Sequence, residues 1–257
     1  MTAALTPAAL PERHLAEVTG TDALNFLQDM VTNDLLPLSR GPGIVWTALL
    51  TPQGKYLADF FVVQTGAALL LDLPATVAEG VLKRLNMYRL RADVAFAASG
   101  LSVGRGLGDA PAGALPDPRH PALGWRHYAP DATDAAGIDW DAIRVAHLIP
   151  ETGIELVPDD SYILEMGFDR LHGVDFRKGC YVGQEVTARM KHKTELRKGL
   201  ARVRIEGAAP PGTEITAGDK VVGRLGTQSG DAALAYLRFD QAKGEMQAGS
   251  ARISGEP

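Results

Sequence analysis

The pattern of residues changes near Leu200, and this change constrains the fold more than any other feature of the sequence. After it, the apolar residues Ala201, Val203 and Ile205 alternate with charged ones, and glycine-rich turns separate further short strands. Before it, helix-like and strand-like segments follow one another. The sequence therefore predicts two domains, an α+β domain over residues 1–196 and a small all-β domain over residues 197–257.

The first domain is expected to contain an antiparallel sheet with helices beside it. Strands are predicted at residues 44–50, 56–64, 68–73 and 90–96, and helices at 20–31, 75–86 and 138–148. The first two strands form a hairpin, because the segment Thr51-Pro52-Gln53-Gly54 has proline and glycine where a type I turn favours them. Residues 104–137 are rich in glycine, proline and alanine, and we expect an ordered loop with one short strand there.

The composition excludes several classes of protein. Hydrophobic residues make up 46% of the chain and charged residues 22%, which is typical of a globular protein. No apolar run reaches the roughly 18–20 residues that span a bilayer, and the first residues lack the pattern of a secretory signal, so we expect a cytoplasmic protein without a membrane partner. The single cysteine excludes a disulfide within the chain and a metal site built from its thiolates alone.

The charge is concentrated in one segment. The whole chain has a net charge of −5, yet residues 177–204 contain nine Lys or Arg and two Glu, a net charge of +7. This segment indicates a positive face for an anionic ligand or partner, with a solvent-exposed basic helix as the plainer alternative.

The only cysteine lies in the segment with the clearest chemical character. Gly179 and Gly183 bracket Cys180, and a helix is predicted to begin at Gln184. The adjacent Lys178 ammonium and the unpaired amides of a helix N-terminus both favour a thiolate, which is a nucleophile or a soft-metal ligand. The alternative is a buried cysteine that acts as a small apolar residue.

Residues Lys178–Glu185 resemble the K-G-C-[FY]-x-G-Q-E signature of the YgfZ-type folate-binding proteins, which include mitochondrial iron–sulfur assembly factors and are related to glycine cleavage T-protein. The resemblance extends over most of the chain, through segments 26–28, 32–34, 52–55, 117–119, 123–126 and 149–153. It implies a T-protein-like folate-binding fold in which residues 1–196 form two lobes around a central channel, followed by a C-terminal β-barrel.

The resemblance also implies a function. It indicates a folate-linked factor for the assembly or repair of iron–sulfur clusters, especially four-iron clusters, with an indirect effect on tRNA thiomethylation. Its partners would be iron–sulfur carrier or client proteins, and Cys180 would bind a cluster only together with ligands from such a partner. Cys180 and its neighbour Lys178 would be the reactive pair. Tetrahydrofolate or a related folate would be the cofactor, and its expected contacts are Trp140, Arg144, Tyr181, Gln184, Glu185 and Arg189.

Two departures from the relatives keep other functions open. Ala58-Asp59 retains one residue of an acidic pair that serves one-carbon transfer in T-proteins, so a tetrahydrofolate-dependent aminomethyltransferase or demethylase that uses Asp59 is the weaker hypothesis. Arg144-Val145-Ala146 has alanine where relatives carry a glutamate that contacts the pterin, so we expect weak folate binding. A third hypothesis is direct binding of tRNA, through Lys191, Lys193, Arg197 and Lys198.

Overall fold

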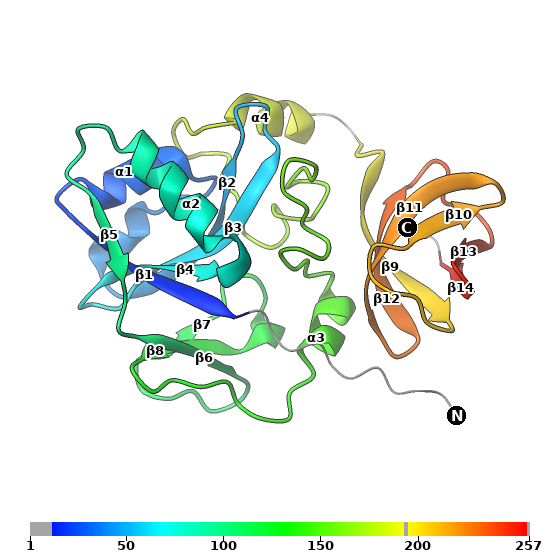
Figure 1. Cartoon of the computed structure of the whole chain (residues 1–257), viewed down its shortest axis with the longest axis horizontal. Coiled ribbons are helices and arrows are strands. Elements are labelled where there is room, and N and C mark those ends of the chain that lie inside the picture. The colour runs from blue at the N-terminus through cyan, green and yellow to red at the C-terminus, as the bar shows by residue number, and fades with distance from the viewer. Residues whose placement is uncertain (1–11, 193–194, 256–257) are drawn as a thin grey trace. The chain divides into compact units, whose positions relative to one another are not determined.

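The computed structural model describes residues 12–192 and 195–255, and the chain forms two compact units (Figure 1). The sheet unit consists of residues 12–136 and 156–196. The barrel unit consists of residues 137–155 and the chain from residue 197 onward. The segment 137–155 thus groups with the barrel, although the sequence suggested that it belongs to the first domain.

A five-stranded antiparallel sheet forms the centre of the sheet unit. The strands lie in the order β2-β3-β4-β1-β5, and their bounds are Arg13–Thr19 (β1), Gly43–Leu50 (β2), Tyr56–Gln64 (β3), Leu69–Pro74 (β4) and Ala95–Ala98 (β5). The predicted hairpin between β2 and β3 is confirmed, and the Gly54 amide closes its turn by donating to the Thr51 carbonyl at 2.8 Å. The expected strand at 90–96 is wrong in its first half, because residues 89–94 form a hydrogen-bonded turn.

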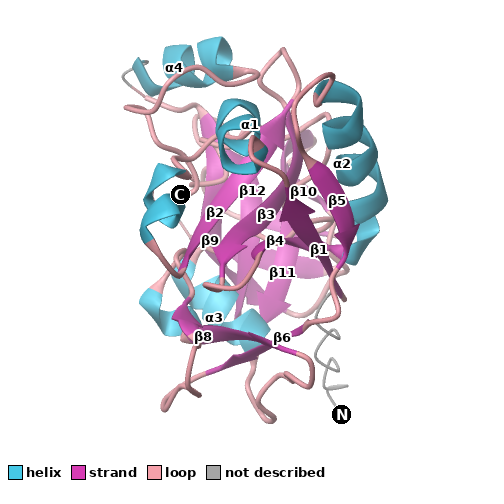
Figure 2. Ribbon diagram, turned by 90° about the vertical axis from the view of Figure 1, so that its left-hand side faces the viewer, coloured by secondary structure: helices cyan, strands magenta, loops and turns pink. Residues whose placement is uncertain are grey.

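Two helices, α1 (Ala23–Met30) and α2 (Ala75–Tyr88), pack against the sheet through one apolar core (Figure 2). Leu27 of α1 and Leu85 of α2 are fully buried there. Alternate residues of β3, among them Phe60 and Val62, join the same core because successive side chains of a strand point to opposite faces. Both helices were predicted from this 3.6-residue spacing of apolar side chains.

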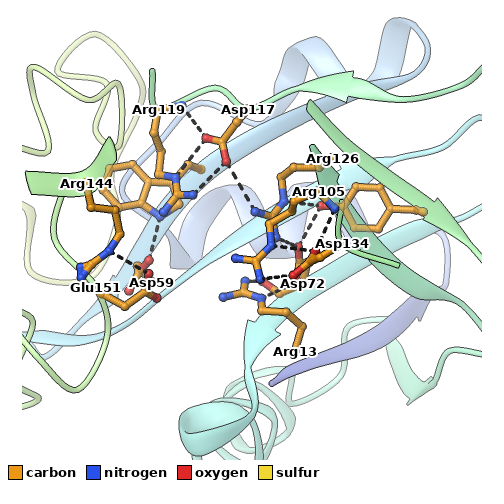
Figure 3. A network of polar contacts seen from close by, with 12 residues as sticks. Arg13, Asp59, Asp72, Arg105, Asp117, Arg119, Arg126, Asp134, Arg144 and Glu151 are labelled. Carbon is orange, nitrogen blue, oxygen red and sulfur yellow. Dashed lines mark hydrogen bonds and ion pairs between the residues drawn. The ribbon is translucent and has the colours of Figure 1, made fainter. Parts of the chain in front are cut away.

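A cluster of buried ion pairs involves Asp72 of β4 and lies beside the Phe61 ring of β3, outside this core (Figure 3). Asp72 of β4 accepts from Arg13 at 2.6 Å and from Arg126 at 2.6 Å, and Arg126 also lies over the Phe61 ring. Burial by itself raises the pKa of Asp72, but the two guanidinium groups hold it far below its ordinary value. Asp117 is paired in the same way, at 2.8 Å from Arg119.

Arg126 belongs to a small sheet that the sequence did not predict. Strands β6 (Ser102–Gly106), β7 (Leu115–Pro116) and β8 (Trp125–Ala129) pair in the order β6-β8-β7, with 3₁₀-helix η2 (Pro121–Leu123) between the last two; another 3₁₀ turn, η1 (Leu36–Arg40), follows α1. The expectation of a loop with one short strand is therefore corrected. Position 106 of β6 requires glycine, because a Cβ there would lie 2.2 Å from the Trp125 ring.

The barrel unit contains a closed six-stranded antiparallel barrel and helix α3 (Trp140–His147). The barrel strands are β9 (Lys198–Glu206), β10 (Glu214–Ala217), β11 (Lys220–Ser229), β12 (Ala232–Arg238), β13 (Met246–Ala248) and β14 (Ala251–Ser254). Alternate residues of β9 are buried, as the sequence pattern predicted. None of the helices within the described part of the chain has the length and apolar character to cross a membrane.

Candidate functional site

The signature segment Lys178–Glu185 is a loop that ends in helix α4 (Gln184–His192), as predicted. The loop packs on the β2–β3 turn through two glycines with positive φ, Gly54 at +74° and Gly183 at +83°. A Cβ on Gly183 would lie 2.5 Å from the Thr51 carbonyl oxygen, and one on Gly54 would lie 2.7 Å from Val186 Cβ. Side chains at either glycine would separate the two segments, so the contact fixes the position of the loop.

Lys178 fixes the other end of the same loop. Its buried ammonium donates to the carbonyl oxygens of Gln28 (2.6 Å), Val31 (2.5 Å) and Asn33 (2.9 Å) at the C-terminal end of α1. Burial lowers the pKa of this ammonium to about 8, against the opposing effect of nearby Asp34, Asp29 and Asp175. All three N–H donors are used, so none is left to bond a Cys180 thiolate.

The Cys180 thiol is exposed, between these two fixed points and ahead of α4. Among the residues that the structure describes, no group of three or more His, Cys, Asp or Glu side chains could hold a metal ion. A metal or cluster at Cys180 would therefore need ligands from another molecule.

The remaining signature side chains differ in their surroundings. Tyr181 is buried with its ring 5.3 Å from the Lys178 ammonium, and burial raises the pKa of its hydroxyl while a hydrogen bond with Thr187 opposes that rise. Glu185 and Arg189 form the expected i,i+4 ion pair at 2.7 Å, but their side chains are 86% and 63% exposed. Such an exposed pair contributes only about 0–1 kcal/mol. Gln184 is half-buried at the start of α4.

An open groove of about 610 Å³ is lined by residues that immediately precede the signature. Asp175, Phe176 and Arg177 form one part of its wall, and Asn33 and Asp34 form another. Ile44, Val45, Trp46, Pro37, Pro118, Val174 and His172 complete the lining. The groove thus offers two carboxylates and one guanidinium beside an apolar surface. No local sequence pattern indicated that Asp34 and Asp175 line a groove, although the Thr32-Asn33-Asp34 segment was part of the resemblance.

Asp59, the predicted carboxylate of one-carbon chemistry, is 6% exposed on β3. It accepts hydrogen bonds from the Trp46 indole and the Tyr56 hydroxyl, both at 2.8 Å. Trp46 in turn stacks on Phe168, with 4.1 Å between ring centroids. These contacts orient the carboxylate within the sheet unit.

Two predicted folate contacts belong to the barrel unit. Trp140 is 8% exposed in the first turn of α3. Arg144 is 3% exposed and donates to Thr227 of β11 at 2.5 Å and to Glu155 at 3.4 Å. Glu155 also accepts from the Thr227 amide and hydroxyl, each at 2.7 Å. Arg144 and Glu155 therefore join segment 137–155 to the barrel, a connection that no local sequence pattern indicated.

The basic segment is not uniformly exposed. Lys178 is buried, whereas Arg189 and Lys191 of α4 and Arg202 and Arg204 of β9 are exposed. Lys191 lies 3.3 Å from Asp169. Lys193, one of the predicted tRNA contacts, lies outside the described residues.

Comparison with known proteins identifies the family. The chain is 30% identical over 279 residues to "Iron-sulfur cluster assembly factor IBA57, mitochondrial" of Homo sapiens, in an alignment that covers 92% of this chain and 78% of that protein. The chain belongs to the IBA57/CAF17 family of iron–sulfur cluster assembly factors, the YgfZ-type family. It is also 30% identical to the Mycosarcoma maydis homologue over 79% of this chain, and that alignment spans only 59% of the relative's length.

Two further matches concern the fold of this IBA57/CAF17 member. The sequence profile of the CAF17 C-terminal β-barrel domain matches residues 197–256. The crystal structure of the glycine cleavage system aminomethyltransferase T from Bartonella henselae has a TM-score of 0.72, at 13% identity, over 95% of this chain and 83% of that one. The expected α+β T-protein-like fold with a C-terminal β-barrel is thus confirmed.

Proposed function

We propose that this chain takes part in the assembly or repair of iron–sulfur clusters, and that Cys180 supplies one ligand to a cluster held jointly with a partner protein. The partner is an iron–sulfur carrier or client protein, and four-iron clusters are the proposed product. The proposed effect on tRNA thiomethylation is indirect, because it acts through the enzymes that carry such clusters.

The exposed thiol of Cys180 carries the proposal. It lies on a loop whose two ends are fixed, by Lys178 on α1 and by Gly183 on the β2–β3 turn. A fixed loop presents the sulfur to another molecule at little cost in conformational entropy. Iron–sulfur clusters are commonly held by four cysteine thiolates, so one sulfur from this chain leaves room for ligands from a partner or a small thiol.

Four of the six residues expected to bind tetrahydrofolate do not fit that cofactor as they stand, because they are engaged by other residues of the chain. Arg144 is already bonded to Thr227 and Glu155, and Tyr181 is buried against Lys178. Glu185 and Arg189 pair with each other in solvent. The proposed role of Cys180 therefore includes no step at folate. Titration of tetrahydrofolate into the purified chain, followed by intrinsic tryptophan fluorescence, tests whether folate binds elsewhere.

The test of the proposal is anaerobic cluster reconstitution of the chain together with a purified iron–sulfur carrier, followed by visible absorption. We expect Cys180→Ala to abolish the absorption of the shared cluster. Glu185→Gln is the matched control, because it alters an exposed signature residue without removing the thiol. An equal cluster yield with Cys180→Ala would remove the cysteine from the mechanism.

The aminomethyltransferase alternative depends on Asp59, whose two oxygens already accept hydrogen bonds from Trp46 and Tyr56. If this alternative holds, Asp59→Asn abolishes tetrahydrofolate-dependent methylene transfer that the native chain performs. The absence of turnover in both proteins excludes it. The cytoplasmic location stays a prediction from the sequence, and the relatives compared above are named as mitochondrial proteins.

A further inference from the structure

Strand β5 is the outermost strand of the five-stranded sheet, beyond β1. Its four residues are Ala95, Phe96, Ala97 and Ala98, of which all but Phe96 are exposed. None of the strands in the described part of the chain pairs with its outer edge. Natural sheets protect such edges by keeping them short or with charged side chains or proline; β5 is short but contains no charged residue and no proline.

The register shows which backbone groups face the open edge. The Ser99 amide donates to the Leu15 carbonyl at 3.0 Å, so these two residues form a hydrogen-bonded pair. Such pairs alternate along an antiparallel ladder, so the next ones join Ala97 and Ala95 of β5 to β1. The amides and carbonyls of Phe96 and Ala98, which alternate with them, point away from β1. A second extended segment can therefore pair with β5 without disturbing the existing ladder.

The turn that leads into β5 lies between α2 and β5 (Figure 1). It presents apolar side chains to solvent. Leu90 is 87% exposed and has a φ of +46°, which is a rare and costly conformation for leucine. Met87, at the end of α2, is 64% exposed, and Tyr88 is 38% exposed. Three neighbouring large apolar side chains outside the core are typical of a contact surface.

This turn is held in place by several hydrogen bonds. Arg89 donates to the Val94 carbonyl at 2.5 Å, and the Asp93 amide donates to Asp22 at 2.8 Å. The Thr21 amide donates to Asp93 at 2.9 Å. A surface with such fixed geometry loses little conformational entropy on binding.

The charges around the turn indicate the chemistry of the partner. Lys83 and Arg91 are exposed next to the apolar side chains, so they complement acidic groups. The carboxylate of Asp93 lies in the same turn, and that of Asp22, just before α1, accepts a hydrogen bond from the Asp93 amide; both would repel a uniformly anionic surface, such as a phospholipid membrane or a nucleic-acid backbone. A polypeptide, in contrast, can place acidic residues next to Lys83 and Arg91 and other residues next to the two carboxylates.

We propose that the open edge of β5 and residues 87–91 together bind an extended, acidic segment of a partner protein, which adds to the sheet as a sixth strand. Main-chain hydrogen bonds to Phe96 and Ala98 provide affinity, and Leu90, Met87 and Arg91 provide selectivity. This inference goes beyond the proposed function, since it assigns a binding surface that does not involve Cys180.

The partner is first captured by photo-crosslinking. The full chain carrying Met87→p-benzoylphenylalanine is irradiated in its own cells, and the adducts are compared with those of a chain carrying the same group at Val221, an exposed barrel residue. We expect an adduct with an acidic protein at position 87 alone. No adduct specific to position 87, or one with lipid or nucleic acid, overturns the proposal.

The captured protein is then purified and titrated against variants of the full chain. Ala98→Pro removes an outward amide but no β1–β5 hydrogen bond, and we expect it to raise Kd about tenfold or more. Arg91→Glu should also raise Kd and reduce its dependence on salt, whereas Val221→Ser should leave Kd unchanged. Equal Kd values for Ala98→Pro and the native chain overturn the proposal.

Hydrogen exchange on the native chain gives a measurement that does not depend on any variant folding correctly. The amides of Phe96 and Ala98 should become protected when the partner binds, and unchanged exchange overturns the inference. Cys180→Ala should bind the partner as the native chain does. Failure of the docking surface is therefore distinguishable from failure of the cluster proposal, which is tested by cluster absorption.

Discussion

The two units stabilise buried charge in opposite ways. In the sheet unit, the three guanidinium groups of Arg13, Arg119 and Arg126 surround the carboxylates of Asp72 and Asp117. In the barrel unit, three carboxylates lie around the single guanidinium of Arg144. The first cluster joins residues 54 and 59 positions apart in the chain, and the second joins mostly neighbours within one segment. Arg126 contacts both buried carboxylates of the first cluster, so its loss should cost more than the loss of any one of the three carboxylates around Arg144.

The largest expected effect is that of Arg126→Met. It leaves Asp72 and Asp117 buried with fewer partners, so the free energy of unfolding should fall by about 3–5 kcal/mol. Denaturant unfolding measures this loss. The control is Arg252→Met, whose exposed ion pair with Glu206 should change stability by about 0–1 kcal/mol. Equal effects of the two substitutions would contradict the structural role of the cluster.

Glu155→Gln should have a smaller effect, of about 1.5–3 kcal/mol, because it removes charged hydrogen bonds while Arg144 keeps two other carboxylates nearby. Those carboxylates are Asp141 at 3.6 Å and Glu151 at 3.8 Å. Hydrogen exchange of the Thr227 amide, which donates to Glu155, reports the change locally. Glu151→Gln serves as the control, and a larger loss from that variant would reverse the assignment of the principal partner.

The signature loop offers a sharper comparison between two glycines four residues apart. Gly183→Ala places a Cβ at 2.5 Å from the Thr51 oxygen in a backbone with φ of +83°, and should cost about 1–3 kcal/mol. A Cβ on Gly179 meets nothing within 4 Å, so Gly179→Ala should stay within about 0.5 kcal/mol of the native chain. Thermal unfolding of both variants distinguishes a loop fixed at Gly183 from one that adapts.

The last expected effect concerns pH. The pKa of Lys178 is lowered from 10.5 to about 8 in the folded chain. Between these values the unfolded chain binds more protons, so this residue makes stability rise with pH from about 8 to about 10.5. Lys178→Met lacks this contribution, so the difference in stability between the native chain and the variant should grow over that range. A constant difference would show that the ammonium is solvated as in the unfolded chain.

Local patterns predicted most of the elements, and distant contacts explain the rest. The hairpin turn at residues 51–54, helix α4 and the alternation in β9 follow from signals within a few residues. The β6-β8-β7 sheet was missed because its short strands lie among glycines and prolines, and their pairing depends on residues about twenty positions away.

The candidate site shows the same division. The exposed cysteine before a helix was expected from its neighbours in the sequence, but the partners of Lys178 lie 145–150 positions away and no local pattern contains them. A single aspartate within the apolar strand Leu69–Pro74 was the one available signal for the buried cluster around Asp72.

The two attachments of the signature loop also limit how far its sulfur can travel. Only four residues, 179–182, lie between Lys178, whose ammonium is bonded at the end of α1, and Gly183, which packs on the β2–β3 turn. Tyr181 among them is itself buried. A stretch of four residues extends to at most about 13–14 Å, so the thiol can swing over a short arc but cannot leave its unit. If Cys180 binds a shared cluster as proposed, the partner must therefore approach this surface and bring its own ligands within reach of the sulfur.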